Sequence, residues 1–550
     1  MMNRFAPLRF ALVASLMLLP ALAGGHLSAL SAQTVTNPND TSAYAKRVLS
    51  QIEKIGRTMV LINNHYVDTI SPEKMADGVI ERMVTSLDPH SNYIPADEVA
   101  ESNEHLMGQF YGVGIEFAVI ADTVTVQRVI SGGPSERVGL YPGDKIIRVD
   151  TTNVAGCGMS STKVRSMLRG DKDTKVTVRV VRRSLPEPVD FTITRGVVPL
   201  NSVESAYCPE PGVMYIRLSN FAKNSSLEIV EAFRNLTTDY PTGLILDLRG
   251  NSGGFVNTAI TIANMFMEKG QTVLFTEGTH SPLSQETLTR DGFYRIGPLV
   301  LLIDGNSASA SEILAGAIQD WDRGLIVGQR SFGKGLVQRM FTLSDGSQLR
   351  LTTARYHTPS GRVIQTPYEE DNRNEYYRSK QHIGDNDSIP VPDSLIFHTL
   401  VRKRQVYGGG GILPDYVVQE DTTRFTKYAV SLFGAGCVAE YANIYCDADR
   451  QGLKARYPDF ESFMAGFSGD TLSEAVEGLY DFAETRGVAR DPEGMQPAET
   501  LIRVRFKALV ARNLFSTNEY FRVINAEDDP EFHKAMDLIH NWPAEFPDHK

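Results

Sequence analysis

After Pro199 the sequence alternates between apolar strand-like runs and helical stretches, and this alternation constrains the fold more than any other feature. The runs 243–248 and 299–303 are short and strongly apolar, as in buried strands. The stretches at about 258–268 and 310–319 follow them with apolar residues at helical spacing. Strands that alternate with helices predict a core of the α/β class.

Other patterns flank this core. Residues 44–106 have helical spacing, with Ser71 and Pro72 expected to open a second helix. Glycine turns then separate short β-branched runs at 123–130, 145–150 and 176–181. At 550 residues the chain is too long for one hydrophobic core. We therefore expect a multidomain α/β protein with an N-terminal helical region at 40–107, a β-rich domain at 108–195, a catalytic core at 196–420 and a mostly helical region of unknown role at 421–550.

The N-terminus has the features of a secretory signal peptide at 1–32. Arg4 and Arg9 precede an apolar stretch at 10–22, and small residues offer cleavage sites after Ala23 or Ala32. A permanent membrane anchor is the weaker alternative, because the apolar stretch is shorter than the roughly 20 residues that a spanning helix needs. We expect an exported protein, periplasmic or associated with the cell envelope.

Charge and cysteine content exclude some classes of function. The formal net charge is −11 at pH 7, and the sequence has no long run of Lys or Arg, so nucleic acid is not an expected partner. Four cysteines are too few for a disulfide-dense scaffold and lack a CxxC metal pattern. Cys437 and Cys446 would form a local disulfide or remain as buried free thiols.

The segment 299–320 carries the strongest catalytic signal. An apolar strand passes through a turn of small residues into an amphipathic helix, so a serine at the junction would be exposed. The unpaired Ala310 N–H at the helix start could stabilise a developing oxyanion, and Ser309 fits the position of a nucleophile. The alternative is that Ser307, Ser309 and Ser311 are only helix caps.

A serine nucleophile needs a base, and Lys334 lies between two glycines at 333–335. A lysine can act as a base when burial disfavours its charged form and lowers its pKa. The alternatives are a solvated lysine in a turn or a phosphate contact, although the Walker pattern is absent. A second oxyanion donor could come from Gly253 or Gly254, in a loop that could equally be a plain glycine turn.

Other polar residues near these segments are expected to be structural. Asp320 lies eleven residues after Ser309, roughly 16 Å along the helix, so it cannot contact the nucleophile and would orient the helix or its neighbours. Asp247, Glu312 and His357 are likewise expected to support the fold.

Taken together, these segments resemble the carboxyl-terminal processing peptidases, also called tail-specific proteases. The resemblance covers residues 88–415 and is carried by an ordered series of motifs at 87–91, 112–117, 139–144, 247–254, 307–312, 332–335 and 358–362. It implies a crotonase/Clp-protease-like α/β core without metal or cofactor, in which Ser309 is the nucleophile and Lys334 the general base. It also implies that Gln338 orients the lysine. Four residues of extended strand span roughly 13 Å, so this role requires a bend at Gly335.

The resemblance further implies that the β-rich stretch is a PDZ domain. Its carboxylate-binding loop would be Gly112, Val113, Gly114 and Ile115, with backbone N–H groups holding the terminal carboxylate of a peptide that adds as a strand. Ser135 and Val138 depart from the alanines common at those positions. The implied partners are proteins with free, apolar C-termini, and a regulatory partner protein and a homo-oligomer remain open.

The sequence therefore predicts an exported serine endopeptidase that recognises the C-terminal tails of its substrates. Domain movement, with the PDZ domain aligning or unblocking the active site, is expected to control cleavage. One alternative is an exported PDZ adaptor with an inactive core, which is disfavoured because every expected catalytic position is filled. The other is a hydratase or acyl-thioester enzyme on a similar core, disfavoured by the signal peptide and the Ser/Lys pair.

Overall fold

The computed structural model describes residues 38–120, 122–130, 132–182, 185–236, 240–368, 376 and 392–542. The expected signal peptide at 1–32 lies outside them. The chain divides into two compact units, residues 1–85 and 86–550. In the described part of the first unit, helices α2 (Pro38–His65) and α3 (Pro72–Thr85) agree with the predicted helical spacing, and α3 begins at the expected proline.

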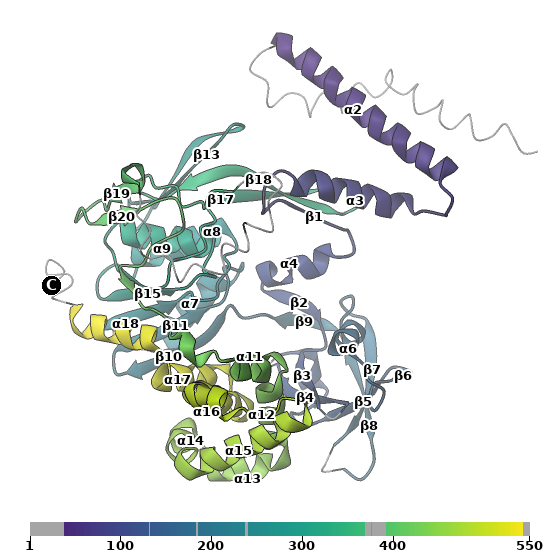
Figure 1. Ribbon diagram of the computed structural model, residues 1–550, viewed down its shortest axis with the longest axis vertical. Helices are drawn as coiled ribbons and strands as arrows, with labels where there is room; N and C mark the ends of the chain where they lie inside the picture. The colour runs from purple at the N-terminus through teal and green to yellow at the C-terminus, as the bar shows by residue number, and fades with distance from the viewer. Residues whose placement is uncertain are drawn as a thin grey trace, which may run out of the picture. The chain divides into compact units, whose positions relative to one another are not determined.

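A six-stranded sheet organises the α/β core in the second unit (Figure 1). Its order is β10-β11-β12-β15-β16-β21, and all neighbours are parallel except β10 and β11. The predicted strands at 243–248 and 299–303 correspond to β12 and β15. The strands are β10 (Val203–Glu210), β11 (Val213–Leu218), β12 (Gly243–Asp247), β15 (Leu299–Ile303), β16 (Leu325–Gly328) and β21 (Tyr416–Val417).

Helices cover both faces of this sheet, so its central strands are buried on both sides. Helices α7 (Ser225–Leu236), α8 (Val256–Phe266) and α9 (Ala310–Asp320) pack with alternate strand residues in one cluster. The other face is covered by α18 (Pro530–His540), through Phe532, Ala535, Leu538 and Ile539. The last helix thus completes the core, although the sequence suggested only a separate helical region. An amphipathic pattern identifies a buried face but not what buries it.

A second sheet lies next to the core. It contains β1 (Asn92–Ile94), β13 (Thr272–Gly278), β14 (Ser281–Thr287), β17 (Leu336–Thr342) and β18 (Gln348–His357), with β17 and β1 both paired to β18. Strand β1 lies within a region that we expected to be helical, so the prediction is wrong there. The short helix α4 (Val99–Met107) in the same region agrees with the prediction. Three residues are too few for an alternating pattern to be recognised.

The predicted β-rich domain forms a separate sheet of order β3-β4-β5-β7-β8, with β6 paired to β5. The predicted strands at 123–130, 145–150 and 176–181 match β4, β5 and β7 to within one residue. The chain enters and leaves this domain through β2 (Gln109–Gly112) and β9 (Gly196–Pro199), which pair with each other. The remaining elements are β3 (Ile115–Ile120), β4 (Thr123–Val129), α5 (Pro134–Arg137), β5 (Lys145–Val149), β6 (Thr152–Asn153), α6 (Ser161–Leu168), β7 (Lys175–Val181) and β8 (Val189–Thr194).

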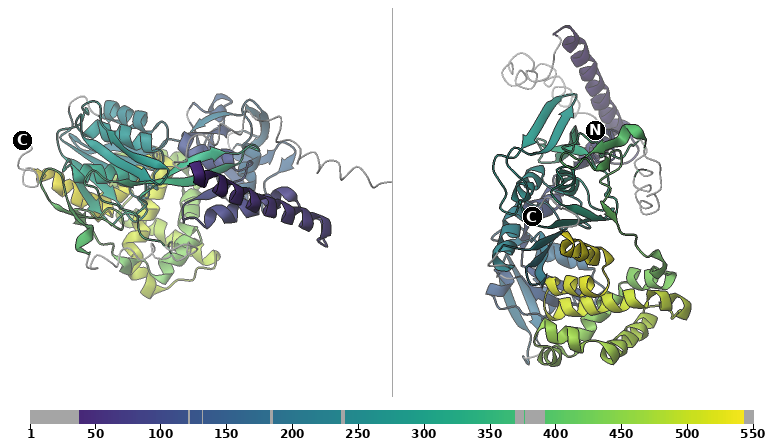
Figure 2. Two further views of the ribbon diagram at one scale, coloured as in Figure 1. Left: turned by 90° about the horizontal axis from the view of Figure 1, so that it is seen from above. Right: turned by 90° about the vertical axis from the view of Figure 1, so that its left-hand side faces the viewer.

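Helices α11 to α17 form their own hydrophobic cluster. They are α11 (Lys427–Gly434), α12 (Cys437–Ala448), α13 (Arg450–Arg456), α14 (Phe460–Gly466), α15 (Gly469–Thr485), α16 (Pro492–Leu514) and α17 (Thr517–Glu527). Helix α12 lies beside β3, and Figure 2 shows the yellow-green C-terminal helices next to the blue strands of the β-rich domain. Asp447 on α12 pairs with Lys145 on β5 at 3.6 Å. Cys437 and Cys446 are free, buried thiols. Both lie on α12, nine residues or roughly 13 Å apart, too far to form a disulfide.

Candidate active site

Ser309 stands directly before helix α9 in a strained backbone conformation. Its φ is 55° and its ψ is −110°, a combination that non-glycine residues rarely adopt. The Ser309 N–H donates to Glu312 Oε2 at 2.8 Å, and its carbonyl accepts the Tyr356 hydroxyl at 3.2 Å. The side chain is half-buried at the junction of β15 and α9. The predicted strand-turn-helix geometry is present, and the surrounding hydrogen bonds hold the strained turn.

The three serines of this turn have different environments. Ser307 Oγ donates to the Leu248 carbonyl and Ser311 Oγ to the Asn251 carbonyl, both at 2.8 Å, and both serines are fully buried. They attach the turn to the loop at 247–254. Ser309 is the one of the three that is not fully buried, which favours it as the nucleophile.

The 247–254 loop lies directly against Ser309. A methyl group added at Gly253 would stand 2.8 Å from Ser309 Cβ and 3.0 Å from the Ala310 nitrogen. At Gly254 it would stand 2.3 Å from the Phe221 carbonyl oxygen. Both glycines have positive φ values, 106° and 148°. Close approach therefore requires glycine at both positions, and the structure brings Gly253, Gly254 and Ala310 to the serine as expected.

The two candidate amides in this loop are not equivalent. The Gly253 N–H donates to Asn251 Oδ1 at 2.9 Å, and the Asn251 side chain also donates to the Leu218 carbonyl. Use of Gly253 as an oxyanion donor would require this local hydrogen bond to open. No described partner accepts the Gly254 N–H. The Ala310 N–H is among those that the first turn of a helix leaves unpaired.

The backbone on both sides of Lys334 is closely packed against neighbouring residues. Gly333 has a φ of 86°, and a methyl group there would clash with Thr366 Oγ1 at 2.2 Å. Lys334 Nζ donates to Gln338 Oε1 at 2.9 Å. Burial lowers the pKa of Lys334, and the nearby Glu312 partly opposes this effect. A lowered pKa increases the neutral fraction of the amine, which a general base requires.

Gln338 reaches the lysine because the chain between them is not a straight strand. Strand β17 begins only at Leu336, and its pairing with β18 shifts register between Val337 and Gln338, as in a β-bulge. The irregularity lies beyond the expected position at Gly335, and Lys334 nevertheless reaches Gln338. A methyl group at Gly335 would instead meet the Gln365 nitrogen at 2.8 Å.

The 87–91 motif, to which the sequence assigned no specific role, supports Gln338. The Gln338 side-chain Nε2 donates to the His90 carbonyl at 2.8 Å. Asp88 holds this turn by accepting the His90 and Ser91 N–H groups, both at 2.7 Å. Because side chains contact one another only in the folded chain, the motif gave no indication of which residue it would hold.

Glu312 joins the two halves of the site. Its fully buried carboxylate accepts the N–H groups of Ser309 and Lys334 on the same oxygen, at 2.8 and 2.9 Å. The other oxygen accepts the Gly333 N–H and the Ser331 hydroxyl. Burial raises the pKa of Glu312. These contacts agree with the expectation that Glu312 is structural, and they connect the segments that carry the expected nucleophile and base.

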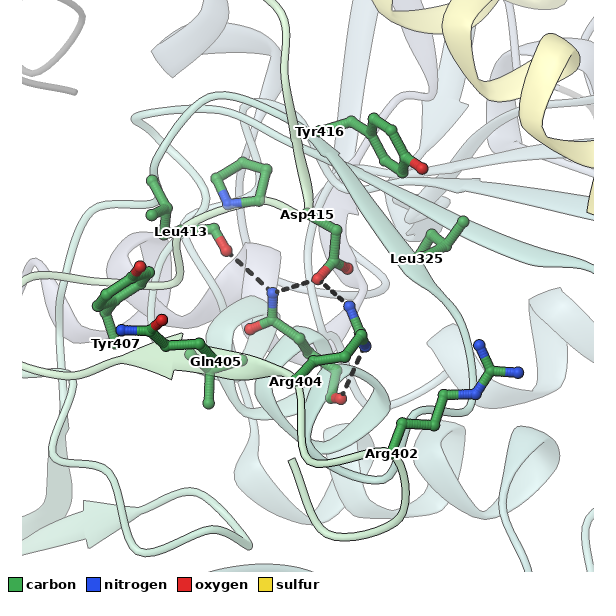
Figure 3. Close-up of a pocket in the computed structure, with 11 residues that line it drawn as sticks. Leu325, Arg402, Arg404, Gln405, Tyr407, Leu413, Asp415 and Tyr416 are labelled. Atoms are coloured by element: carbon green, nitrogen blue, oxygen red, sulfur yellow. Dashed lines mark hydrogen bonds and ion pairs between the residues drawn. The ribbon is translucent and has the colours of Figure 1, made fainter. Parts of the chain in front are cut away.

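Asp320 lies at the far end of α9 from Ser309. It forms a fully buried ion pair with Arg362 of the 358–362 motif and accepts the Ser360 N–H at 2.8 Å. The neighbouring Gln319 donates to the Leu413 carbonyl and to Asp415, which pairs with Arg404 beside a cavity of about 370 Å³ (Figure 3). These contacts attach α9 to the 358–362 motif and to the 404–415 segment, the kind of orienting role predicted for Asp320.

The expected tail-binding loop lies at the edge of the β-rich domain, between β2 and β3. Its carbonyls are occupied: Val113 accepts the Ser135 N–H at 2.9 Å, and Gly114 accepts the Ile130 N–H at 3.0 Å. Gly114 has a φ of 77°. The N–H groups of Val113 and Gly114 have no described partner. Ile115 begins β3, an edge strand that a peptide could extend.

Ser135 stands where an alanine is common, so it adds a buried hydroxyl group to this turn. The residue is fully buried below the loop, and its hydroxyl has no hydrogen-bond partner among the described residues. Val138 packs against the core of the β-rich domain.

In the described ranges, no helix is long and apolar enough for a membrane span, and no group of three or more His, Cys, Asp or Glu side chains could hold a metal ion.

Comparison with known families matches four parts of the chain. Residues 212–372 match peptidase family S41 and residues 112–193 match the PDZ domain. Residues 22–98 match the N-terminal domain of the activating protease CtpB, and 428–516 match a family of unknown function, DUF8443. The β-rich domain is therefore a PDZ domain, and the catalytic core is of the S41 type.

Curated relatives support the same assignment. A carboxy-terminal-processing protease of Bartonella bacilliformis is 32% identical over 357 residues, which are 62% of this chain and 79% of the relative. The carboxy-terminal processing protease CtpA of Bacillus subtilis is 30% identical over 57% of this chain and 67% of its own. Among solved structures, a photosystem II D1 C-terminal processing protease is 27% identical over 67% of this chain and 92% of its own, with a TM-score of 0.34.

The family match covers the segments that carry the serine, the lysine and the glycine loop, and the first of these relatives is covered over most of its length. The chain belongs to peptidase family S41, as a serine peptidase of the carboxyl-terminal processing type that carries a PDZ domain.

Proposed function

We propose that this chain is an exported serine endopeptidase that cleaves proteins recognised through their C-terminal tails. Ser309 is the nucleophile, Lys334 the general base, and Gln338 the residue that orients the lysine. The observation that carries the proposal is the meeting of the Ser309 and Lys334 backbones on one oxygen of the buried Glu312 carboxylate. This shared partner holds the proposed nucleophile and base, 25 positions apart in the chain, in one site.

Acylation begins when neutral Lys334 accepts the Ser309 hydroxyl proton while Ser309 Oγ attacks the substrate carbonyl. The Ala310 N–H and a glycine N–H of the 247–254 loop donate to the resulting oxyanion. The lysine then gives its proton to the leaving amine, and an acyl-enzyme remains. Hydrolysis repeats these steps with water as the nucleophile and Lys334 again as the base, which regenerates the free serine.

Gln338 supports this cycle by accepting one Lys334 N–H at 2.9 Å, while its own amide is held by the His90 carbonyl. A neutral amine that donates to Gln338 retains a lone pair for the serine proton. Domain movement, with the PDZ domain aligning or unblocking the site, controls access.

Tail recognition is assigned to the loop at Gly112, Val113, Gly114 and Ile115. The unoccupied N–H groups of Val113 and Gly114 are suited to a terminal carboxylate, and the peptide would then extend the sheet beside β3. A PDZ domain of a carboxy-terminal protease from Vibrio cholerae has been solved in complex with a peptide. Apolar C-terminal residues are the expected recognition element.

The test compares cleavage of an unstructured protein with an apolar C-terminus by the unmutated chain, Ser309→Ala and Lys334→Ala. Ser431→Ala and Lys454→Ala, at exposed helical positions, are the matched controls. We expect both catalytic variants to lose cleavage while both controls keep it, and an amidated tail to slow the unmutated enzyme. Tail binding without cleavage by the unmutated chain would instead support an inactive adaptor.

Export is tested separately by sequencing the N-terminus of the protein recovered from the cell envelope fraction. Cleavage of the proposed signal peptide would leave a chain that begins at Gly24 or Gln33. A protein that retains Met1 and is found with cytoplasmic proteins would contradict export.

A further inference from the structure

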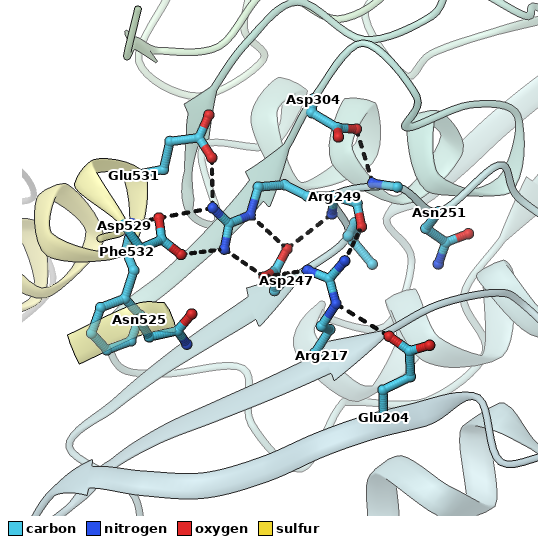
Figure 4. Close-up of polar contacts among 12 residues, drawn as sticks. Glu204, Arg217, Asp247, Arg249, Asn251, Asp304, Asn525, Asp529, Glu531 and Phe532 are labelled. Atoms are coloured by element: carbon cyan, nitrogen blue, oxygen red, sulfur yellow. Dashed lines mark hydrogen bonds and ion pairs between the residues drawn. The ribbon is translucent and has the colours of Figure 1, made fainter. Parts of the chain in front are cut away.

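The Arg249 guanidinium is enclosed by carboxylates from two distant parts of the chain (Figure 4). Asp247, two residues earlier in the 247–254 loop, accepts from Nε and from one terminal nitrogen at 3.0 and 2.7 Å. Asp529 accepts from both terminal nitrogens at 2.8 Å, and Glu531 accepts from one of them at 2.6 Å. The five N–H donors of the arginine are thereby all used, so its position is fully determined.

Asp529 and Glu531 belong to the C-terminal segment, some 280 residues after Arg249. Asp529 caps α18 by accepting the Phe532 N–H at 2.9 Å. The same helix packs Phe532, Leu538 and Ile539 against the second face of the catalytic sheet. This packing fixes the carboxylates at the end of the sheet where β12 leads into the 247–254 loop.

A second arginine connects the side-chain contacts to the loop backbone. Arg217 donates to Asp247 at 2.7 Å and to the Arg249 carbonyl oxygen at 2.8 Å. Arg249 is therefore held both through its side chain and through its main chain. Asp247 is fully buried, and Asp529 is almost so.

Only a few residues separate Arg249 from the reacting groups. Asn251 accepts the Ala308 N–H at 3.0 Å, and Gly253 lies within van der Waals contact of Ser309. Displacement of Arg249 would move these loop atoms relative to the serine. Errors of about 1 Å in the position of catalytic groups reduce rates by roughly 100-fold.

We propose that Asp529 and Glu531 are positioning residues for the peptidase reaction, which hold the 247–254 loop in its active conformation through Arg249. The proposal rests on the proposed function. It makes catalysis depend on a segment beyond both the S41 match at 212–372 and the DUF8443 match at 428–516. The C-terminal region thus contributes to the active site as well as to the fold.

Arg249, Asp529 and Glu531 line a cavity of about 920 Å³. Isosteric changes there should be accommodated, so Glu531→Gln and Asp529→Asn test the proposal. Asparagine is as good a helix cap as aspartate. Asp528→Asn is the matched control, because Asp528 lies in the same turn but pairs with Arg424 and not with Arg249.

The experiment measures kcat and KM on the unstructured substrate for the full chain, these three variants and Ser309→Ala, together with thermal unfolding. We expect kcat to fall roughly 10- to 100-fold in Glu531→Gln and Asp529→Asn, with KM unchanged. Asp528→Asn should keep the parental kcat. Glu531→Asp, which retains the carboxylate, should recover part of the loss. A purely structural role would lower kcat only in proportion to the folded fraction that thermal unfolding gives at the assay temperature.

Equal kcat values in Glu531→Gln, Asp529→Asn and Asp528→Asn, with Ser309→Ala inactive, would overturn the proposal and leave the proposed function intact. If one variant unfolds below the assay temperature, the other decides the outcome. If even the unmutated chain does not cleave, the proposed function fails, and this inference fails with it.

Discussion

At the scale of single residues, the site depends on how burial changes the protonation of two groups. Burial favours the neutral forms of both Lys334 and Glu312, so it lowers the pKa of the lysine and raises that of the carboxyl. Hydrogen bonds to Glu312 from Ser309, Gly333, Lys334 and Ser331 oppose its protonation. The lysine can therefore be neutral at a lower pH than a solvated lysine, while the carboxyl continues to accept hydrogen bonds.

The first prediction concerns the pH dependence of cleavage. A general base acts only when deprotonated, so kcat should rise with pH and level off above the Lys334 pKa, which lies below its usual value of about 10.4. The measurement is kcat between pH 6 and 10. Lys334→Arg should be inactive across this range because arginine stays protonated. A rate that falls as pH rises would contradict the assignment of the lysine as a base.

The second prediction concerns Glu312→Gln. Glutamine has one acceptor oxygen, and its amide N–H groups would face donors that the carboxylate now accepts. We expect kcat to fall and the free energy of unfolding to drop by about 1–3 kcal/mol. Denaturant unfolding and steady-state kinetics measure the two effects.

Glu228→Gln is the control for this variant. Glu228 also accepts several hydrogen bonds, from Ser202 and Val203, but lies away from Ser309. It should lose stability with kcat preserved. If both variants lose stability while both retain kcat, Glu312 does not connect the catalytic segments in the way that we propose.

At the scale of elements, the site is assembled from loops at the carboxyl ends of parallel strands. Strand β12 leads into the 247–254 loop, and β15 leads into the turn before Ser309. The two strands are neighbours in the sheet, so their following loops meet. The 333–335 segment and Gln338 reach the site from the second sheet, where a bulge in β17 directs the glutamine to the lysine.

The third prediction tests the close approach of these loops. In Gly253→Ala the added methyl would meet Ser309 Cβ at 2.8 Å, in addition to the strain of a positive φ. We expect loss of nearly all activity and a free energy of unfolding lower by more than the roughly 1–2 kcal/mol that the strain costs. Cleavage assays and denaturant unfolding measure these quantities.

Gly346→Ala separates strain from contact. Gly346 has a φ of 92°, but a methyl group there would meet nothing closer than 3.9 Å. It should lose a similar strain energy and keep its activity. Full activity in Gly253→Ala would mean that the loop does not need to approach the serine so closely.

At the scale of the whole molecule, the PDZ domain is an insertion whose two connections run side by side. Gly112 at the end of β2 is paired with Gly196 at the start of β9. The C-terminal region contacts the PDZ domain at α12 and the active-site loop at Asp529 and Glu531. One helical region thus borders both the recognition and the catalytic parts of the second unit.

The fourth prediction uses this geometry. Residues 113–195 can be replaced by a two-residue Asn-Gly turn, because the paired ends are already as close as in a hairpin. The shortened enzyme should fold, cleave at a changed rate, and no longer distinguish free from amidated tails. The measurement is the ratio of kcat/KM on the two substrates. An unchanged rate together with an unchanged preference for free tails would contradict both gating and tail recognition by the PDZ domain.

Much of the molecule was predictable because the relevant patterns are local. Apolar spacing identified β12, β15, α8 and α9, and three strands of the PDZ domain, β4, β5 and β7, to within about two residues. Strand β1 was missed because it has three residues, and the role of α18 was missed because its partner lies far along the chain. A bend before Gln338 was expected because four extended residues would hold it too far from Lys334. The bulge in β17 does not lie at the expected glycine, Gly335.

The sequence by itself determined the class of fold, because apolar spacing is a local pattern. Together with the family resemblance, it also selected Ser309, Lys334 and the two glycines as candidates for the site. Only the tertiary structure showed which of the three serines is not fully buried, that Glu312 joins Ser309 to Lys334, and that Asp529 and Glu531 enclose Arg249. Contacts such as that of Arg249 with Asp529, 280 positions apart, depend on how helices and sheets pack, and no local pattern records that packing.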